Sequence, residues 1–236
     1  MVLLSRISTY LVPLIYFITA LSWLIHPNWV YYGSVLVILF LALSIYSITK
    51  QSENIKMFLS EMIYPLFVQV ISLSFIVFLP KGWLYVLMII FFSFMLYLIL
   101  NEAFNRHHPF LGKTFEFTTK LQMVLIVSLV FFMAVIGYNL VLYLGWQLWV
   151  VSLVMIFLIA LLLLRLQGIS NKLDYLFVDT AITILTMEIF FILHYLPIDI
   201  YFKGLIVAAN IFILFNYIIN KQFYNIKKQY DFKEKA

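Results

Sequence analysis

Few residues of this chain place a reactive side chain in an apolar neighbourhood, and most of them fall between residues 174 and 196. After Asp174 at its start, this stretch holds two further carboxylates, Asp179 and Glu188, together with Thr183, in a run that is otherwise mostly apolar. A carboxyl group there can exchange a proton, hold a polar substrate or bind a neighbouring helix. At about 100° per residue, Asp179 and Thr183 share one face of a helix, whereas Glu188 lies about 180° from Asp179.

Glu188 is predicted to be the deepest of these groups. With a rise of about 1.5 Å per residue, it lies near the middle of its apolar run, and Gln69 and Asn210 lie near the middles of two others. No lysine or arginine is expected at this depth, so the carboxyl is either protonated and hydrogen bonded or faces a hydrated cavity. We predict a contact among these three residues, either as a polar clasp between helices or as a site for a substrate or proton.

Two adjacent histidines, His107 and His108, occur in a polar segment from residue 101 to 116. Neighbouring imidazoles can begin a zinc site, but such a site needs a third or fourth ligand at suitable spacing. The carboxylates nearby, Glu102 and Glu116, form no HExxH or similar arrangement. We therefore predict no metal site here, and a polar loop at the membrane surface instead.

The remaining ionisable residues suggest structural roles. Asp179 and Glu61 lie closer to the inner ends of their runs, where we expect each to pair with a loop lysine or with water. Asp199 and Lys203 are similar in spacing to the last helix of retinal proteins, but they follow Pro197 at an outer edge, far from the middle of a run. No hydroxyl has an adjacent base, and no phosphate-binding motif appears. We predict no catalytic residue and no cofactor.

The share of hydrophobic and charged residues predicts the helices that position these side chains. Hydrophobic residues make up 65% of the chain and charged residues only 11%, whereas roughly a quarter of a soluble protein is charged. The sequence predicts an all-α fold, a polytopic membrane helix bundle forming one domain over residues 1–236, with no soluble domain. About eight transmembrane helices are expected, at residues 9–25, 29–49, 57–79, 83–100, 117–138, 146–164, 174–196 and 200–220, followed by a basic tail at 221–236.

The basic residues indicate an orientation. All of the 15 lysines and arginines except Lys81 and Lys203 fall at the two termini, in alternate connections between the predicted spans or, for Lys120, in the first turn of the span that follows such a connection. Basic loops remain cytoplasmic in a bacterial inner membrane, so both termini are predicted to be cytoplasmic. The net charge of +5 is then explained by attraction of the basic loops and tail to an anionic leaflet. The predicted partner is the lipid bilayer, other membrane proteins are a further candidate, and no nucleic acid is expected.

Two glycines introduce a similar spacing in different spans. Gly33 and Gly204 each follow aromatic residues, and each is followed at the same intervals by a tyrosine and a lysine. One interpretation is a duplicated helical unit in parallel orientation. The other is the general tendency of aromatic residues and lysines to collect at the two membrane interfaces.

Two motifs support a resemblance. The stretch Glu188-Ile-Phe-Phe-Ile-Leu-His-Tyr-Leu-Pro197 and the earlier Tyr64-Pro65-Leu66-Phe67 resemble those of uncharacterised eight-pass integral membrane proteins of small-genome bacteria. The resemblance implies an eight-pass fold and a role, structural or otherwise, for Glu188 and Pro197. No activity is attached to that family, so it implies none here.

Three classes of function remain open. A non-enzymatic membrane component or scaffold, which partners other membrane proteins, requires Glu188 to be satisfied by neighbouring side chains. A small transporter or proton-coupled carrier requires water to reach Glu188 at mid-depth. A membrane enzyme acting on lipid or lipid-linked substrate requires the polar groups of residues 174–196 and the segment 101–116 to converge at the inner surface.

Overall fold

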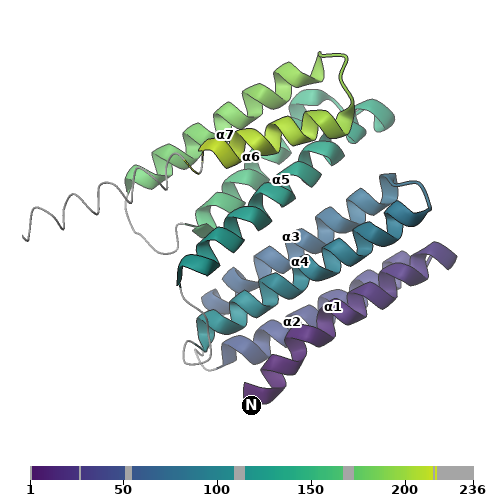
Figure 1. Cartoon of the computed structure of the whole chain (residues 1–236), viewed down its shortest axis with the longest axis vertical. Coiled ribbons are helices and arrows are strands. Elements are labelled where there is room, and N and C mark those ends of the chain that lie inside the picture. Colours follow the sequence, from purple (N-terminus) through teal and green to yellow (C-terminus); the bar gives the residue numbers. More distant parts are fainter. Residues whose placement is uncertain are drawn as a thin grey trace, which may run out of the picture. The chain divides into compact units, whose positions relative to one another are not determined.

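A computed structural model shows a helical chain, as predicted for the fold class (Figure 1). The structure describes residues 2–26, 28–50, 55–108, 115–166, 173–214 and 216. The helices in this part of the chain are α1 (Val2–Ile25), α2 (Trp29–Thr49), α3 (Ile55–Phe78), α4 (Trp83–His107), α5 (Phe115–Leu144), α6 (Leu148–Leu166), α7 (Leu173–His194) and a last helix, Ile200–Leu214.

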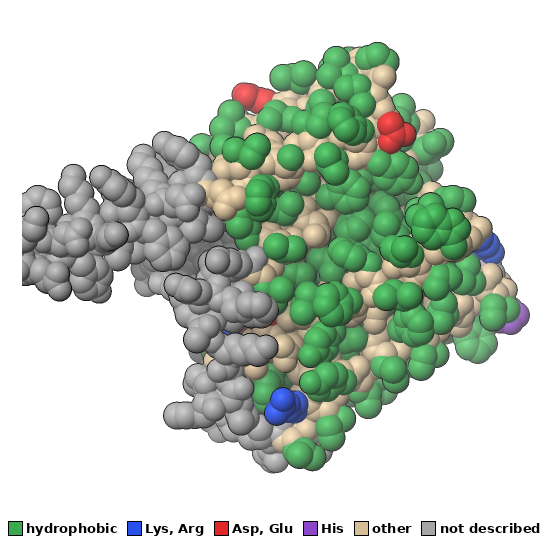
Figure 2. Space-filling view, viewed as in Figure 1, with side chains coloured by type: hydrophobic (Ala, Val, Ile, Leu, Met, Phe, Trp, Pro, Cys, Tyr) green, Lys and Arg blue, Asp and Glu red, His purple; other side chains and the backbone are tan. Residues whose placement is uncertain are grey.

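Five of the described helices are long and apolar enough to cross a membrane. They cover Ser5–Ile25, Trp29–Thr49, Met57–Phe78, Trp83–His107 and Leu121–Leu144, and three shorter apolar helices cover Leu148–Leu163, Thr180–His194 and Ile200–Leu214. Figure 2 shows hydrophobic side chains over most of the visible surface of the described residues, with few charged ones between them. The helices are those of a multi-pass membrane protein.

Glycine, proline and aspartate residues stand at two of the turns between helices. Gly145, between α5 and α6, has φ +65°, a backbone conformation that side-chain-bearing residues avoid and that commonly ends a helix. After Pro197, the carboxylate of Asp199 accepts a hydrogen bond of 2.8 Å from the backbone N–H of Tyr201. This bond satisfies one of the free N–H groups at the start of the last helix.

Helix α4 continues beyond its predicted end. The apolar run stops at Leu100, and residues 101–107 were expected in a loop, but they form the last two turns of α4. Glu102 and Arg106 face each other across one of these turns, and such pairs four residues apart stabilise a helix. Hydropathy detects the apolar part of a helix only, so it missed this polar extension.

The sequence predicts one membrane domain, and the helix contacts divide the chain into two compact units, Met1–Lys120 and Leu121–Ala236. In the first unit, α1 packs against α2 and α4, and α3 packs against the same two helices. Hydroxyl groups join these helices: Ser44 of α2 donates to Ser8 of α1 at 2.9 Å, and Ser93 of α4 donates to the Pro13 carbonyl of α1 at 2.8 Å. Apolar helices in lipid gain little from the hydrophobic effect when they associate, so hydrogen bonds between helices contribute to their association.

Glycines bring helices close together in the second unit. A Cβ added to Gly137 of α5 would lie 3.2 Å from Val151 of α6 and 3.1 Å from Phe190 of α7. A Cβ added to Gly204 of the last helix would lie 2.6 Å from Val135 of α5. Helix α5 therefore touches side chains of α6 and α7 and approaches the last helix, while α6 and α7 pack most closely against each other.

Candidate functional site

Two threonines of α7, the predicted Thr183 and also Thr186, point into the second unit. Thr183 and Thr186 are buried, with 3% and 0% of their surface exposed. The Thr186 hydroxyl donates to the Ile182 carbonyl at 2.7 Å, and the amide of Asn210 donates to the same hydroxyl at 3.4 Å. Asn210 thus forms a polar link from the last helix to α7, through a threonine.

Glu188 lies on a different side of α7 from these threonines. Its carboxylate side chain is exposed, and exposed apolar residues surround it one turn away in both directions: Ile184, Leu185 and Ile192. We call these four residues the Glu188 face. The predicted contact of Glu188 with Gln69 and Asn210 stays a prediction, since Gln69 belongs to the first unit. Asp179 lies on α7, and its side chain is outside the described residues.

Gln69 is fully buried near the middle of α3. Neither Oε1 nor Nε2 of its side-chain amide has a hydrogen-bond partner among the described residues. On the same helix, the Ser72 hydroxyl donates to the Gln69 backbone carbonyl at 2.9 Å. The side-chain amide therefore keeps its full capacity to donate and accept hydrogen bonds.

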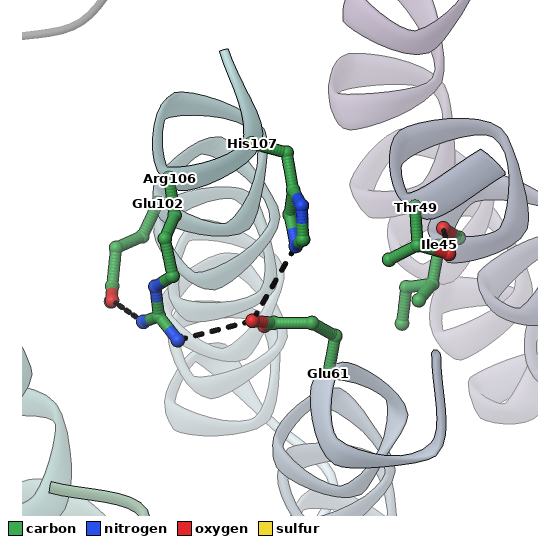
Figure 3. A network of polar contacts seen from close by, with 6 residues as sticks. All are labelled: Ile45, Thr49, Glu61, Glu102, Arg106 and His107. Atoms are coloured by element: carbon green, nitrogen blue, oxygen red, sulfur yellow. Dashed lines mark hydrogen bonds and ion pairs between the residues drawn. The ribbon is translucent and has the colours of Figure 1, made fainter. Parts of the chain in front are cut away.

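A cluster of charged residues joins α3 to the last two turns of α4 (Figure 3). Arg106 binds Glu61 of α3, with 3.0 Å between Nη1 and Oε1, and also binds Glu102 one turn back on α4. His107 completes the α3–α4 ion cluster, with its Nε2 3.7 Å from the same oxygen of Glu61. In Figure 3, Thr49 of α2 stands beside this cluster, where its hydroxyl donates to the Ile45 carbonyl at 2.9 Å.

Burial makes this cluster structurally important. Glu61 and Glu102 expose only 4% and 8% of their surface, so each carboxylate depends on its hydrogen-bond partners. The Arg106 side chain is 39% exposed, so solvent screening reduces the loss on its removal below the ~3–5 kcal/mol typical of a fully buried pair. Glu61 has the structural pairing that we predicted, although its partner is an arginine of α4 and not a loop lysine.

The two adjacent histidines do not point to one common ligand site. His107 faces Glu61, whereas the buried His108 packs edge-on against the ring of Phe104, with 4.6 Å between ring centroids. Among the described residues, no three histidine, aspartate or glutamate side chains are placed to hold a metal ion. Glu116 and residues 109–114 lie outside the side chains that the structure describes.

The two lysines that depart from the charge pattern bind carbonyl groups at helix ends. Lys203 is 5% exposed, and its Nζ donates to the His194 carbonyl at the end of α7 at 3.1 Å. The same Nζ lies 5.5 Å from the ring centroid of Tyr138. Lys81 donates in the same way to the Leu24 carbonyl near the end of α1, at 3.4 Å. A cation is favourable there, because the last carbonyls of a helix carry partial negative charge.

Sequence reasoning missed both the ion cluster and these lysine contacts. The spacing of Glu102 and Arg106 was a usable signal, because charges four residues apart meet on a helix, but the segment was read as a loop. For Lys203 the sequence holds no equivalent signal, since its acceptor belongs to the preceding helix and is reached only through the turn at Pro197.

Comparison with known proteins adds no relative: no family model matches the chain, and no curated protein or solved structure matches it either. The class of protein is therefore inferred from its helices alone. Their length and apolar composition are those of a helical, multi-pass membrane protein.

Proposed function

We propose that the chain crosses a bacterial cytoplasmic membrane eight times, with both termini in the cytoplasm. The three shorter apolar helices fall inside the predicted spans 146–164, 174–196 and 200–220, and each is a candidate to complete the five longer ones. The alternation of basic connections and the resemblance to eight-pass bacterial membrane proteins support the same arrangement. The basic tail at 221–236 follows the last predicted span.

Within that arrangement, the chain acts as a non-enzymatic membrane component that binds another membrane protein. The observation that carries this proposal is the Glu188 face. A carboxyl group near the middle of a membrane helix costs about 2.5–3.5 kcal/mol on insertion scales, and the exposed apolar residues around it offer no hydrogen bond. A polar group on a partner helix would satisfy Glu188, and the flanking isoleucines would pack against the same helix.

Photo-crosslinking from single cysteines tests this proposal, because the chain contains no cysteine. Ile184→Cys and Ile192→Cys, which replace residues 51% and 63% exposed on the Glu188 face, would each carry a benzophenone label in intact membranes. Leu153→Cys on α6, where leucine is 57% exposed, is the matched control. We expect a discrete adduct with one other protein from the first two positions and lipid adducts from the third.

Glu188→Leu in the same cysteine variants identifies the role of the carboxyl group. We expect the protein adduct to fall several-fold while the amount of chain in the membrane stays constant. Adducts confined to lipid, or to another part of the same chain, at both Ile184 and Ile192 would refute the proposed partner.

A small carrier is the second candidate, with its site around Glu188. A carrier needs polar groups at mid-depth that a solute can reach, and the Glu188 side chain is exposed near the middle of the predicted span 174–196. Glu188→Gln separates the candidates. A carrier that uses this carboxyl for proton coupling loses its cellular phenotype, whereas an unchanged phenotype in a folded variant argues against a carrier.

The residues required for an enzyme belong to different units: Thr183 belongs to the second unit and residues 101–107 belong to the first. The enzymatic function stays a prediction.

A further inference from the structure

The interior of the first unit contains hydrogen-bonding groups without a protein partner at half the height of its helices. Gln69 and Tyr16 both expose 0% of their surface. The two amide atoms of Gln69 and the hydroxyl of Tyr16 have no hydrogen-bond partner among the described residues. Each lies near the middle of its membrane-length helix, Met57–Phe78 for Gln69 and Ser5–Ile25 for Tyr16.

Ser72 places these groups in one region. It lies one turn after Gln69 on α3, so the two side chains emerge on neighbouring parts of the same helix face. The Tyr16 hydroxyl faces the Ser72 side chain from α1, although it completes no hydrogen bond of normal geometry. The Ser72 hydroxyl already donates to the Gln69 carbonyl, which leaves its oxygen free to accept. Amide, phenol and serine hydroxyl thus form a small polar region that we call the interior polar site.

The polar atoms of this site need a hydrogen-bond partner, because leaving them unsatisfied costs free energy. A buried polar atom without a hydrogen bond costs about 1–3 kcal/mol, and the interior of the first unit holds three such atoms on Gln69 and Tyr16. Lipid around the unit cannot supply a bond, and the burial of all three side chains excludes a large ligand. Water is the smallest molecule that both donates and accepts hydrogen bonds, and a buried water typically makes about three of them to buried polar groups that are otherwise unsatisfied.

We propose that Gln69, Tyr16 and Ser72 bind water inside the first unit. The Gln69 Nε2 donates to a water oxygen, Oε1 accepts from a water hydrogen, and the Tyr16 hydroxyl extends the chain of bonds to Ser72. The proposal concerns the first unit alone and does not depend on a partner at Glu188. It assigns a hydrated position near the middle of the membrane-length helices α1 and α3.

The second unit provides a matched control in Tyr138. This tyrosine is also 0% exposed and also lies in a membrane-length helix, α5. Its hydroxyl, however, donates to the Phe190 carbonyl at 2.9 Å. The two tyrosines therefore differ in the feature under test: one hydroxyl is bonded to protein and the other is available to water.

Radiolytic hydroxyl-radical footprinting of the full chain in lipid nanodiscs tests the proposal. Radicals generated from bound water modify side chains that bulk solvent does not reach, and mass spectrometry locates the products. We expect Tyr16 to be modified several-fold faster than Tyr138 in the unaltered protein. Equal protection of the two tyrosines would overturn the proposal, and this comparison requires no substitution.

Gln69→Leu then tests the assignment of the amide as a water ligand. We expect Tyr16 modification to fall to the rate of Tyr138, in a protein whose helical circular dichroism and elution volume are unchanged. Undiminished labelling of Tyr16 in such a folded variant would refute the role of Gln69. Val70→Leu, next to it on α3 but 58% exposed, is the control and should leave the labelling as it was.

Discussion

Buried hydroxyl and ammonium groups of the second unit illustrate what single residues contribute to this protein. Tyr138 stacks against the Phe190 ring, with 4.3 Å between centroids, while its hydroxyl bonds to the backbone of α7. Lys203 covers the same tyrosine ring and the end of α7. One aromatic side chain of α5 thus connects three helices.

Tyr138→Phe removes the hydroxyl while it keeps the ring. We expect the free energy of unfolding to fall by about 0.5–1.5 kcal/mol, the net contribution of one hydrogen bond, in thermal or denaturant unfolding of the purified protein. Tyr143→Phe on the same helix, where the tyrosine is 73% exposed, should leave stability unchanged. An equal effect of the two substitutions would contradict the role of the Phe190 bond.

Two kinds of contact stabilise pairs of helices: the close approach of the last helix to α5 at Gly204, and the ion cluster between α3 and α4. Gly204→Ala tests the first. The new Cβ would lie 2.6 Å from Val135 and 3.3 Å from the Phe131 carbonyl, so the last helix has to move away from α5. Overpacking of this kind typically costs about 1–3 kcal/mol, measurable as a lower melting temperature. Gly82→Ala is the control, because nothing lies within 4 Å of the added carbon.

A double-mutant cycle tests the ion cluster. We expect Arg106→Gln and Glu61→Gln each to destabilise the first unit, and the double variant to lose less than the sum of the two. A coupling energy of about 1 kcal/mol is the expected size for a contact that is partly exposed. Strict additivity in thermal unfolding would show that the 3.0 Å contact between these residues contributes no stability of its own.

Orientation in the membrane is a property of the whole molecule. Lys81 and Lys203, the two exceptions to the charge pattern, bind helix carbonyls, so each has a structural reason to lie where the pattern predicts few cations. Reporter fusions test the arrangement: a fusion after Leu79 is expected outside the cytoplasm, and a fusion after Lys113 inside it. The reverse pair of results would refute the eight-span topology.

Hydropathy and helix-ending residues were enough to predict the helices themselves. The ends of α2 and the start of α4 agree closely with the predicted spans 29–49 and 83–100, because proline, glycine and a change in polarity act locally along the chain. The polar extension of α4 was missed for the converse reason, since its stability depends on Glu102, Arg106 and the carboxylate of Glu61 on another helix.

The sequence by itself determined the helical class, the membrane character and the few residues with polar chemistry at depth. These are properties of composition along the chain and need no knowledge of packing. Only the tertiary structure decided which of those residues have partners: Asn210 reaches Thr186, Glu61 reaches Arg106, and the Gln69 amide reaches no described protein group. A helix surrounded by lipid is apolar on every side, so its sequence carries little periodicity to show which face packs against protein.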